Sequence, residues 1–478
     1  MSSGRLKALT YRVENIPYGT TKEQLVSDYF YVKDQGDIKV KSLVPAVDTV
    51  EGEEGDYTAT VLFHPHESRQ GGPRVQDDSI TVDRDFCGFT PLYVPPKEKG
   101  PIAADIIAVT GLAGHAFGSW AHSDEHMWLR DYLPRDIPNV RILTYGYYSK
   151  LRDDTTVNIL QDHTNKFVHG LIDVREDGQC ESRPIIFIGH SLGCLIIKKA
   201  LSDAISLGIT RSRLPVRGII FLAPPHRGLD IDALRILVKG EPTEALIMEL
   251  KSQSPTLTWL NQSFAQFARD IDILTCYENK PTNTVINVNG EWKREGPAVM
   301  MVTLDSARQY YPKEKLVSAD SDHSQIARIM KGQNGIYPSV KSAIKRGLVS
   351  TARIVAGAGE NNVESPSLEE QINTLQLSPS PPSYSRGDAI KSQFDVEPVA
   401  EFHPALISQE SAGEHAMPMG IRDPVITSEH NRRQNLLDKP PATESYIEIQ
   451  EIIPGTVSSN AVKIRQGENE ENEADDDE

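Results

Sequence analysis

The clearest hydrophobic pattern in the chain is RPIIFIGHSLGCLIIKKA, residues 183–200. Consecutive apolar residues near its start are followed by a short turn with glycines, after which apolar residues recur at helical spacing. A continuous apolar run of this length is typical of a parallel strand that is buried on both faces. Ser191 stands in the turn between Gly189 and Gly193. We therefore expect a strand, a sharp turn that presents Ser191, and a helix.

Other apolar runs of strand length stand on both sides of this unit. DIIAVT (105–110) comes before it, and GIIFLA (218–223), IDILTCY (271–277) and LVSA (316–319) come after it. Strands that alternate with helical patterns predict an α/β fold with a mostly parallel central sheet. One helical pattern, residues 232–267, is either a cap that gives Ser191 an apolar acyl pocket or a set of helices that covers the sheet. Both interpretations stay open.

The first 95 residues predict a separate small α+β module of ferredoxin-like type. Strands are expected at 11–16, 38–44, 57–63 and 79–83, with a helix at 21–29. This order resembles an RNA-recognition motif. Such motifs stack bases on aromatic side chains of the two central strands, but Arg12, Thr58 and Thr60 occupy the matching positions here. We therefore expect a protein-contact or packing module and no nucleic-acid binding.

Composition changes the picture for the C-terminal quarter. Only 38% of the 478 residues are hydrophobic and the net charge is −17, which indicates that part of the chain does not fold. Residues 351–478 have few apolar periods and end in GENEENEADDDE. We expect a module at 1–95, a linker at 96–101, an α/β domain at 102–350 and a disordered acidic tail at 351–478. The tail either binds protein partners, as the module can, or is a solvated end.

The turn around Ser191 has the pattern of a nucleophile elbow, G-x-S-x-G between a strand and a helix. Folds with this elbow place an acid and then a histidine later in the chain, at the carboxyl edge of the sheet. Glu278 directly follows the 271–277 run, and His323 lies in the loop after 316–319. Ser191, His323 and Glu278 are therefore the predicted catalytic residues. Asp305 is the alternative acid, and His226, after 218–223, is a competing base.

A serine nucleophile also needs N–H groups that bind the tetrahedral oxyanion. The N–H of Leu192 follows the nucleophile, and the glycine-rich segment after the first strand offers those of Leu112 and Ala113. This segment contains neither a P-loop nor a dinucleotide fingerprint. We expect no cofactor and no metal.

The four cysteines, Cys87, Cys180, Cys194 and Cys276, have no spacing typical of metal sites or disulfides, which fits a reducing compartment. No apolar stretch is long enough to span a membrane, and the first residues lack the apolar core of a signal peptide. We expect a cytoplasmic protein that can associate peripherally with an intracellular membrane, at the endoplasmic reticulum or the mitochondrion.

Together these residues resemble the lipase-like serine esterases of eukaryotes, an α/β-hydrolase family that includes the serine-active-site-containing proteins. The segments that carry the resemblance are GLAGHAFGSW (111–120), WLRDYLPRDIPNVRILTYGY (128–147), FIGHSLGCLIIKKAL (187–201) and GIIFLAPPHRG (218–228). Thr110 and Cys194 depart from the family pattern, in which a histidine and a glycine often stand there. The resemblance implies an enzyme that hydrolyses carboxylic esters, of lipids or other acyl compounds, through an acyl-enzyme. The competing hypothesis is a hydrolase fold kept as a non-catalytic scaffold for protein interactions.

Overall fold

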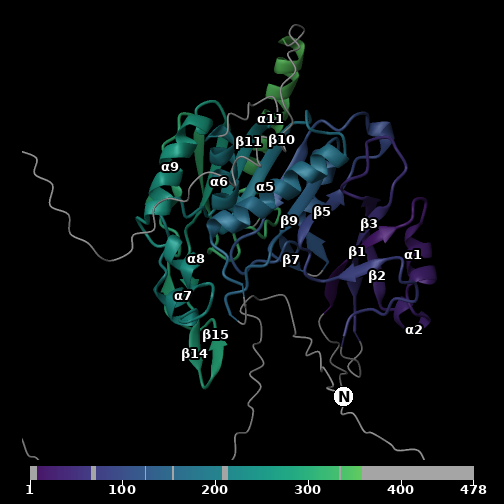
Figure 1. Cartoon of the computed structure of the whole chain (residues 1–478), viewed down its shortest axis with the longest axis horizontal. Coiled ribbons are helices and arrows are strands. Elements are labelled where there is room, and N and C mark those ends of the chain that lie inside the picture. The colour runs from purple at the N-terminus through teal and green to yellow at the C-terminus, as the bar shows by residue number, and fades with distance from the viewer. Residues whose placement is uncertain are drawn as a thin grey trace, which may run out of the picture. The chain divides into compact units, whose positions relative to one another are not determined.

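The computed structural model describes residues 8–357 except 66–70, 124, 153–155, 207–213 and 333–334. Two main sheets are present in this part of the chain, a four-stranded sheet near its start and a seven-stranded sheet in its centre (Figure 1). The predicted tail from residue 358 onward lies outside the described residues. No helix within them is both long and apolar enough to cross a bilayer.

The seven-stranded sheet has the order β17-β12-β11-β10-β6-β9-β5. Its strands are β5 Gly88–Tyr93, β6 Asp105–Val109, β9 Arg141–Gly146, β10 Ile185–His190, β11 Val216–Leu222, β12 Asp272–Glu278 and β17 Glu314–Ala319. All neighbours pair in parallel except β5, which is antiparallel to β9. The predicted, mostly parallel sheet is confirmed, and with its elbow and helices it forms an α/β-hydrolase fold.

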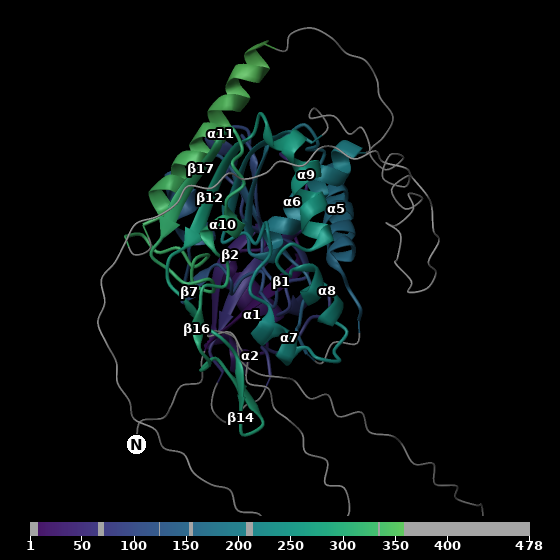
Figure 2. The same cartoon turned by 90° about the vertical axis from the view of Figure 1, so that its left-hand side faces the viewer.

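Helices cover both faces of this sheet because successive residues of each strand point to opposite sides. Ile107 and Phe187 pack with one set of helices, whereas Ile106 and Ile186 pack with the other. The first set is α5 Leu160–Asp177, α6 Leu192–Ser206 and α9 Pro255–Ala268; the second is α3 Trp128–Asp131, α4 Leu133–Asp136 and α11 Tyr337–Gly357. Figure 2 shows α5, α6 and α9 on one side of the strands and α11 on the other. Two short helices, α7 Asp232–Leu237 and α8 Glu244–Glu249, precede α9.

Of the helices in residues 232–267, α9 covers the sheet: Leu260 and Phe264 are almost completely buried, and the Phe264 ring packs against Phe221 of β11. Helix α8 lies instead beside the segment that follows β9, where Thr243 donates to the Leu151 carbonyl at 2.7 Å and Glu249 accepts from the Leu160 N–H at 2.8 Å. The covering role therefore holds for α9, and α7 and α8 are left as the candidate cap. The helix α11 continues past the expected boundary at residue 350 and ends at Gly357.

Smaller elements complete the described part. They are α10 Leu304–Ala307, the 3-10 helix η1 Lys97–Lys99 and three short antiparallel pairs, β7 Ala121–Ser123 with β8 His126–Met127, β13 Thr282–Asn283 with β16 Ala298–Val299, and β14 Ile286–Val288 with β15 Glu291–Lys293. The last two pairs lie between β12 and β17, in the insertion that carries Asp305.

The N-terminal module forms a sheet with the order β2-β3-β1-β4. Its elements are β1 Leu9–Ile16, α1 Lys22–Tyr29, α2 Val32–Gln35, β2 Ile38–Pro45, β3 Tyr57–Phe63 and β4 Thr81–Asp83. Thr21 caps α1 with a capping box, in which its hydroxyl accepts from the Gln24 amide. No helix lies between β3 and β4 in the described residues, although an RNA-recognition motif has one there.

The module's polar sheet face is buried against the α/β domain. Arg12 of β1 donates to Thr90 Oγ1 of β5 at 3.1 Å and to the Cys87 carbonyl at 2.9 Å. Arg130 of α3 donates to Thr60 Oγ1 of β3 at 3.4 Å. The positions that lack base-stacking aromatics are thus used for packing within the chain.

The strand β5 differs from the expectation. Its residues fall within the first 95, yet they pair with β9 and form the edge of the larger sheet. Pro91 lies in this strand, and an edge is where a sheet tolerates a residue without an N–H. The pattern around residue 90 gave no sign of which sheet the strand joins, because pairing partners far apart in the sequence decide it.

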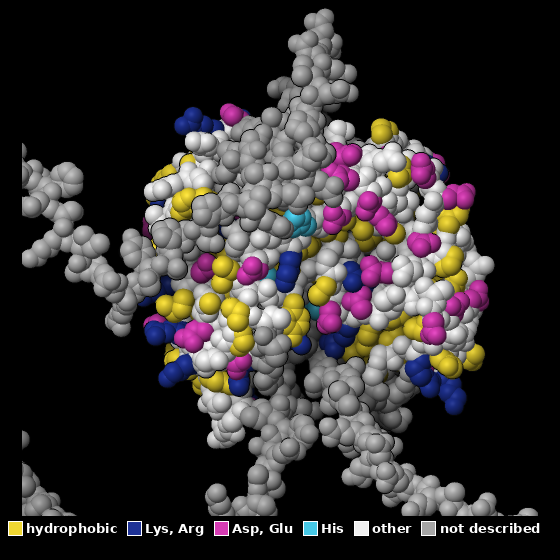
Figure 3. All heavy atoms as spheres, in the orientation of Figure 1, with side chains coloured by type: hydrophobic (Ala, Val, Ile, Leu, Met, Phe, Trp, Pro, Cys, Tyr) yellow, Lys and Arg dark blue, Asp and Glu magenta, His cyan; other side chains and the backbone are white. Residues whose placement is uncertain are grey.

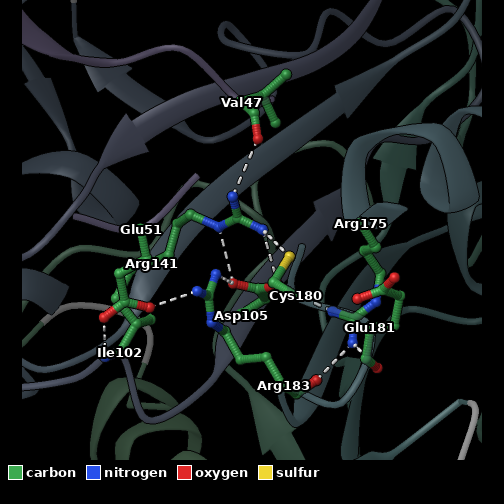
Figure 4. Close-up of polar contacts among 9 residues, drawn as sticks. All are labelled: Val47, Glu51, Ile102, Asp105, Arg141, Arg175, Cys180, Glu181 and Arg183. Atoms are coloured by element: carbon green, nitrogen blue, oxygen red, sulfur yellow. Dashed lines mark hydrogen bonds and ion pairs between the residues drawn. The ribbon is translucent and has the colours of Figure 1, made fainter. Parts of the chain in front are cut away.

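A cluster of charged side chains joins the module to the amino ends of the central strands (Figure 4). Asp105, the first residue of β6, accepts from Arg141 at 2.8 and 2.9 Å, from Arg175 at 2.9 Å and from Arg183 at 3.3 Å. Glu51 of the β2–β3 loop bonds Arg183 at 2.5 Å. Burial alone would raise the pKa of the Asp105 carboxyl, but the three guanidinium groups outweigh burial and hold it below its usual value.

Candidate active site

Ser191 lies at the sharp turn between β10 and α6. Its φ of 49° is in the left-handed region, which costs free energy for any residue with a Cβ and is common at functional turns. A Cβ on Gly189 would lie 2.8 Å from Cys194 Cα, and one on Gly193 would lie 2.3 Å from the Val109 carbonyl oxygen. Only glycine fits at either place, so the predicted nucleophile elbow is confirmed as a structural unit.

The structure brings the three predicted catalytic side chains together. Ser191 Oγ and His323 Nε2 are 2.9 Å apart, and His323 Nδ1 and Glu278 Oε2 are 2.7 Å apart. The Glu278 side chain is fully buried, whereas that of His323 is 14% exposed. A hydroxyl, an imidazole and a buried carboxylate joined in this order are the arrangement that activates a serine as a nucleophile.

Glu278 is held by the backbone of a distant loop. It is the last residue of β12, and its Oε1 accepts from the Val302 N–H at 2.8 Å. Both carboxylate oxygens therefore have a partner, one the imidazole and one an amide. This fixes the carboxylate in the position where it can orient His323.

His323 lies in a loop after β17 that is held by hydrogen bonds within its own turn. The Asp322 carboxylate accepts from the amides of Ser324 and Gln325, each at 2.9 Å. The His323 N–H donates to Thr282 Oγ1 at 3.0 Å, and the His323 carbonyl accepts from His190 Nε2 at 2.9 Å. His323 is thus fixed at its ring and at its backbone N–H and carbonyl groups.

The candidate oxyanion donors differ in whether their N–H already donates to another group of the protein. The Ala113 N–H donates to the Ser149 carbonyl and to Ser149 Oγ, both at 3.1 Å. Among the described residues, no acceptor takes the N–H of Leu192 or of Leu112. Leu112 is therefore a better candidate than Ala113 for the second donor. A Cβ on Gly111 would lie 3.0 Å from Ser191 Cβ, so this loop runs directly beside the elbow.

The two competing residues are placed elsewhere. Asp305, on α10, pairs with Arg227 at 2.9 Å, and its side chain is 73% exposed. Thr303 caps this helix through the Ser306 amide, which turns residue 305 outward. His226 is fully buried with its ring against Phe221. Burial and the charge of Lys198 hold the pKa of His226 well below its usual value.

Sequence reasoning missed the residues that support this site. Val302, Thr282 and Ser149 each make one of the bonds described above. No periodic or motif signal marks Val302 or Thr282, because both lie in the irregular insertion between β12 and β17. Ser149 follows the apolar run of β9 at the carboxyl edge, and this placement was a usable signal.

No family model matches the chain. Protein SERAC1 of Danio rerio is 26% identical over 269 residues, which cover 52% of this chain and 39% of that protein. Protein SERAC1 of Homo sapiens is 28% identical over 227 residues, which cover 43% of this chain and 35% of that protein. The chain thus spans between a third and two fifths of the length of the curated relatives it matches.

Two solved structures resemble it at low identity. The mature lipase BlEst2 of Bacillus licheniformis gives a TM-score of 0.36 at 16% identity, covering 53% of this chain and 96% of that one. The type II thioesterase YbtT gives 0.34 at 11%, covering 55% and 100%. The α/β-hydrolase fold of this chain follows from its own strand order and elbow.

Proposed function

We propose that the chain is a serine hydrolase that cleaves carboxylic esters of lipids or other acyl compounds. The observation that carries this proposal is the continuous chain of hydrogen bonds from Ser191 Oγ through His323 to Glu278, with distances of 2.9 and 2.7 Å. Each group in it has a complementary partner, and the serine is presented on a strained elbow. This combination is required for acyl transfer and is costly for a fold that has no use for it.

In the proposed reaction Ser191 Oγ attacks the ester carbonyl carbon while His323 Nε2 accepts its proton. The tetrahedral oxyanion is bound by the N–H groups of Leu192 and Leu112. His323 then gives the proton to the leaving alcohol, which leaves an acyl group on Ser191. Water attacks this acyl-enzyme with His323 again as the base, and Glu278 stabilises the imidazolium in both steps.

Apolar side chains near the site support an acyl substrate. Leu112 and Met301 are partly buried and pack against the core cluster that also contains Leu192. Leu112 belongs to the candidate oxyanion loop, and Met301 precedes the residue that holds Glu278. Partly covered apolar side chains beside a nucleophile favour the hydrocarbon part of a substrate.

A nucleic-acid partner is not supported. The module face that binds RNA in related folds is buried by Arg130 and β5. On the face shown in Figure 3, basic side chains lie in small groups separated by acidic and apolar ones. A broad positive surface, which phosphate backbones require, is lacking on this face.

Labelling with a fluorophosphonate probe tests the proposal without knowledge of the substrate. The wild-type chain should label and should hydrolyse a short activated ester, whereas Ser191→Ala should do neither. Ser263→Ala, a serine substitution on α9, is the matched control and should label as the wild type does. A wild-type protein that melts cooperatively but does not label would favour the scaffold hypothesis.

A further inference from the structure

His190, the residue before the proposed nucleophile, makes a bond that the catalytic chain does not use. It ends β10, is 9% exposed, and places its Nε2 2.9 Å from the carbonyl oxygen of His323. The two imidazole rings lie 5.4 Å apart. The residue next to the nucleophile therefore contacts the backbone of the proposed base directly.

The geometry fixes the state of this imidazole. A carbonyl oxygen can only accept, so Nε2 of His190 carries the proton and donates it. Burial lowers the pKa of His190 to about 3, and a positive charge on His323 acts in the same direction. His190 is consequently a neutral donor, whose other nitrogen, Nδ1, is buried and has no hydrogen-bond partner within the described part of the chain.

The peptide unit on the other side of His323 is held as well. The His323 N–H donates to Thr282 Oγ1 at 3.0 Å, and Thr282 is buried in β13. β13 pairs with β16, which ends three residues before Val302, the donor to Glu278. The backbone carbonyl of His323 is thus bonded to the elbow, and its backbone N–H to the insertion that holds the acid.

The oxyanion loop packs on the same imidazole. A Cβ on Gly111 would lie 3.0 Å from His190 Nδ1 and equally close to Ser191 Cβ. His190 therefore touches the loop that offers the Leu112 N–H, while its other nitrogen holds the base. Three segments that are distant in the sequence meet at this one ring.

We propose that His190 is a positioning residue that sets His323 against Ser191 by holding the His323 carbonyl, together with Thr282 at the His323 amide. The inference rests on the proposed function, because positioning matters only if His323 acts as the base. A displacement of the imidazole by about 1 Å is enough to slow a proton transfer of this kind by about 100-fold. The contact concerns the geometry of the reacting groups and leaves substrate binding alone.

Two substitutions of His190 distinguish the loss of its hydrogen bond from a change in the shape of its side chain. His190→Phe keeps a flat ring and removes the donor, whereas His190→Gln can return an N–H close to the place of Nε2. In His190→Phe we expect kcat for an activated ester and the rate of fluorophosphonate labelling to fall about 100-fold, with KM within about twofold. His190→Gln should recover at least about tenfold of this loss.

The control is His169→Phe, the same exchange on α5, which should leave both rates unchanged. Thr282→Val should also slow labelling, and the double variant with His190→Phe should be non-additive because both residues bond the backbone of His323. The inference is wrong if His190→Phe labels at the wild-type rate, or if both His190 variants lose activity only in proportion to their unfolded fraction. Wild-type protein that fails to label would instead contradict the proposed function.

Proton nuclear magnetic resonance can test the role of His190 even if the wild-type protein does not label. The low-field proton resonance of the His323–Glu278 hydrogen bond should shift or broaden in His190→Phe and be retained in His190→Gln. An unchanged resonance in both variants would show that His190 does not set the position of His323.

Discussion

The two ends of β6 differ in charge pairing and in backbone strain. At its start, Asp105 is fully buried and is matched by the guanidinium groups of Arg141, Arg175 and Arg183. Beyond its other end, Ser191 and Ala113 have positive φ angles of 49° and 50°, and His190 Nδ1 has no hydrogen-bond partner among the residues that the structure describes. Strained and unsatisfied groups persist only where the surrounding structure over-determines them. Charge pairing is therefore concentrated at the amino end of the strand, and backbone strain at the carboxyl end, beside the proposed site.

The largest effect on kcat is expected from a substitution in the proposed site that leaves the fold intact. Glu278→Gln keeps the shape but removes the charge that stabilises the imidazolium, so kcat should fall by about 10³- to 10⁴-fold. Asp305→Asn, at the exposed carboxylate paired with Arg227, is the matched control and should change kcat less than about twofold. Steady-state rates on an activated ester measure both. The reverse ranking would move the acid to Asp305.

A change at the charged start of β6 should have the opposite effect: the free energy of unfolding should fall while the labelling rate is retained. Asp105→Asn leaves three nearly buried arginines without their shared carboxylate, which should lower the free energy of unfolding by about 3–5 kcal/mol. The labelling rate of the remaining folded protein should stay within about twofold, because Ser191 lies at the other edge. Urea unfolding and fluorophosphonate labelling of the same samples decide this. A loss of labelling in fully folded Asp105→Asn would show that the two ends are coupled.

The stability that Asp105 contributes should depend on pH. The pKa of Asp105 lies below its usual value in the folded chain, so its stabilising effect is complete above the unfolded pKa of about 3.9 and is lost as pH falls through the folded pKa. The difference in unfolding free energy between wild type and Asp105→Asn should therefore be constant from about pH 7 to 5 and shrink below about pH 4. Chemical denaturation across this range measures the difference. A gap that widens on acidification would contradict the assignment.

The smallest effect is expected at the exposed rim of the cluster. Glu51 bonds Arg183 at 2.5 Å, but its side chain is 39% exposed. Glu51→Gln should lower the free energy of unfolding by less than about 1 kcal/mol, and salt should reduce the effect. Thermal melts at low and high ionic strength test this. If Glu51→Gln lowered the free energy of unfolding as much as Asp105→Asn does, the contact with the module, and not Asp105, would be the main source of the cluster's stabilising effect.

Much of the framework could be predicted from the sequence because it depends on local pattern. The apolar runs predicted β6, β10, β11, β12 and β17 within a few residues but not β9, and the parallel order implied that Glu278 and His323 emerge beside Ser191. Their distances agree with that placement. Their catalytic roles stay a prediction until the serine is labelled.

What could not be predicted depends on loops and on contacts between distant segments. The surroundings of the alternative acid depend on such contacts: Asp305 lies on a short helix capped by Thr303 and pairs with Arg227. The loss of Ala113 as an oxyanion donor depends on Ser149, and the placement of β5 depends on β9. None of these leaves a periodic trace in the sequence, since each is decided by a partner tens of residues away or by a single turn.

The edge strand β5 makes the two parts of the chain mutually dependent. Its residues are continuous in sequence with the module, yet its backbone hydrogen bonds go to β9, and Arg12 of β1 reaches Thr90 within it. A protease cut in the segment around η1 would break one peptide bond and none of these contacts. The fragments on either side of such a cut should remain a non-covalent complex, so the chain is a natural starting point for a split protein whose two parts reassemble.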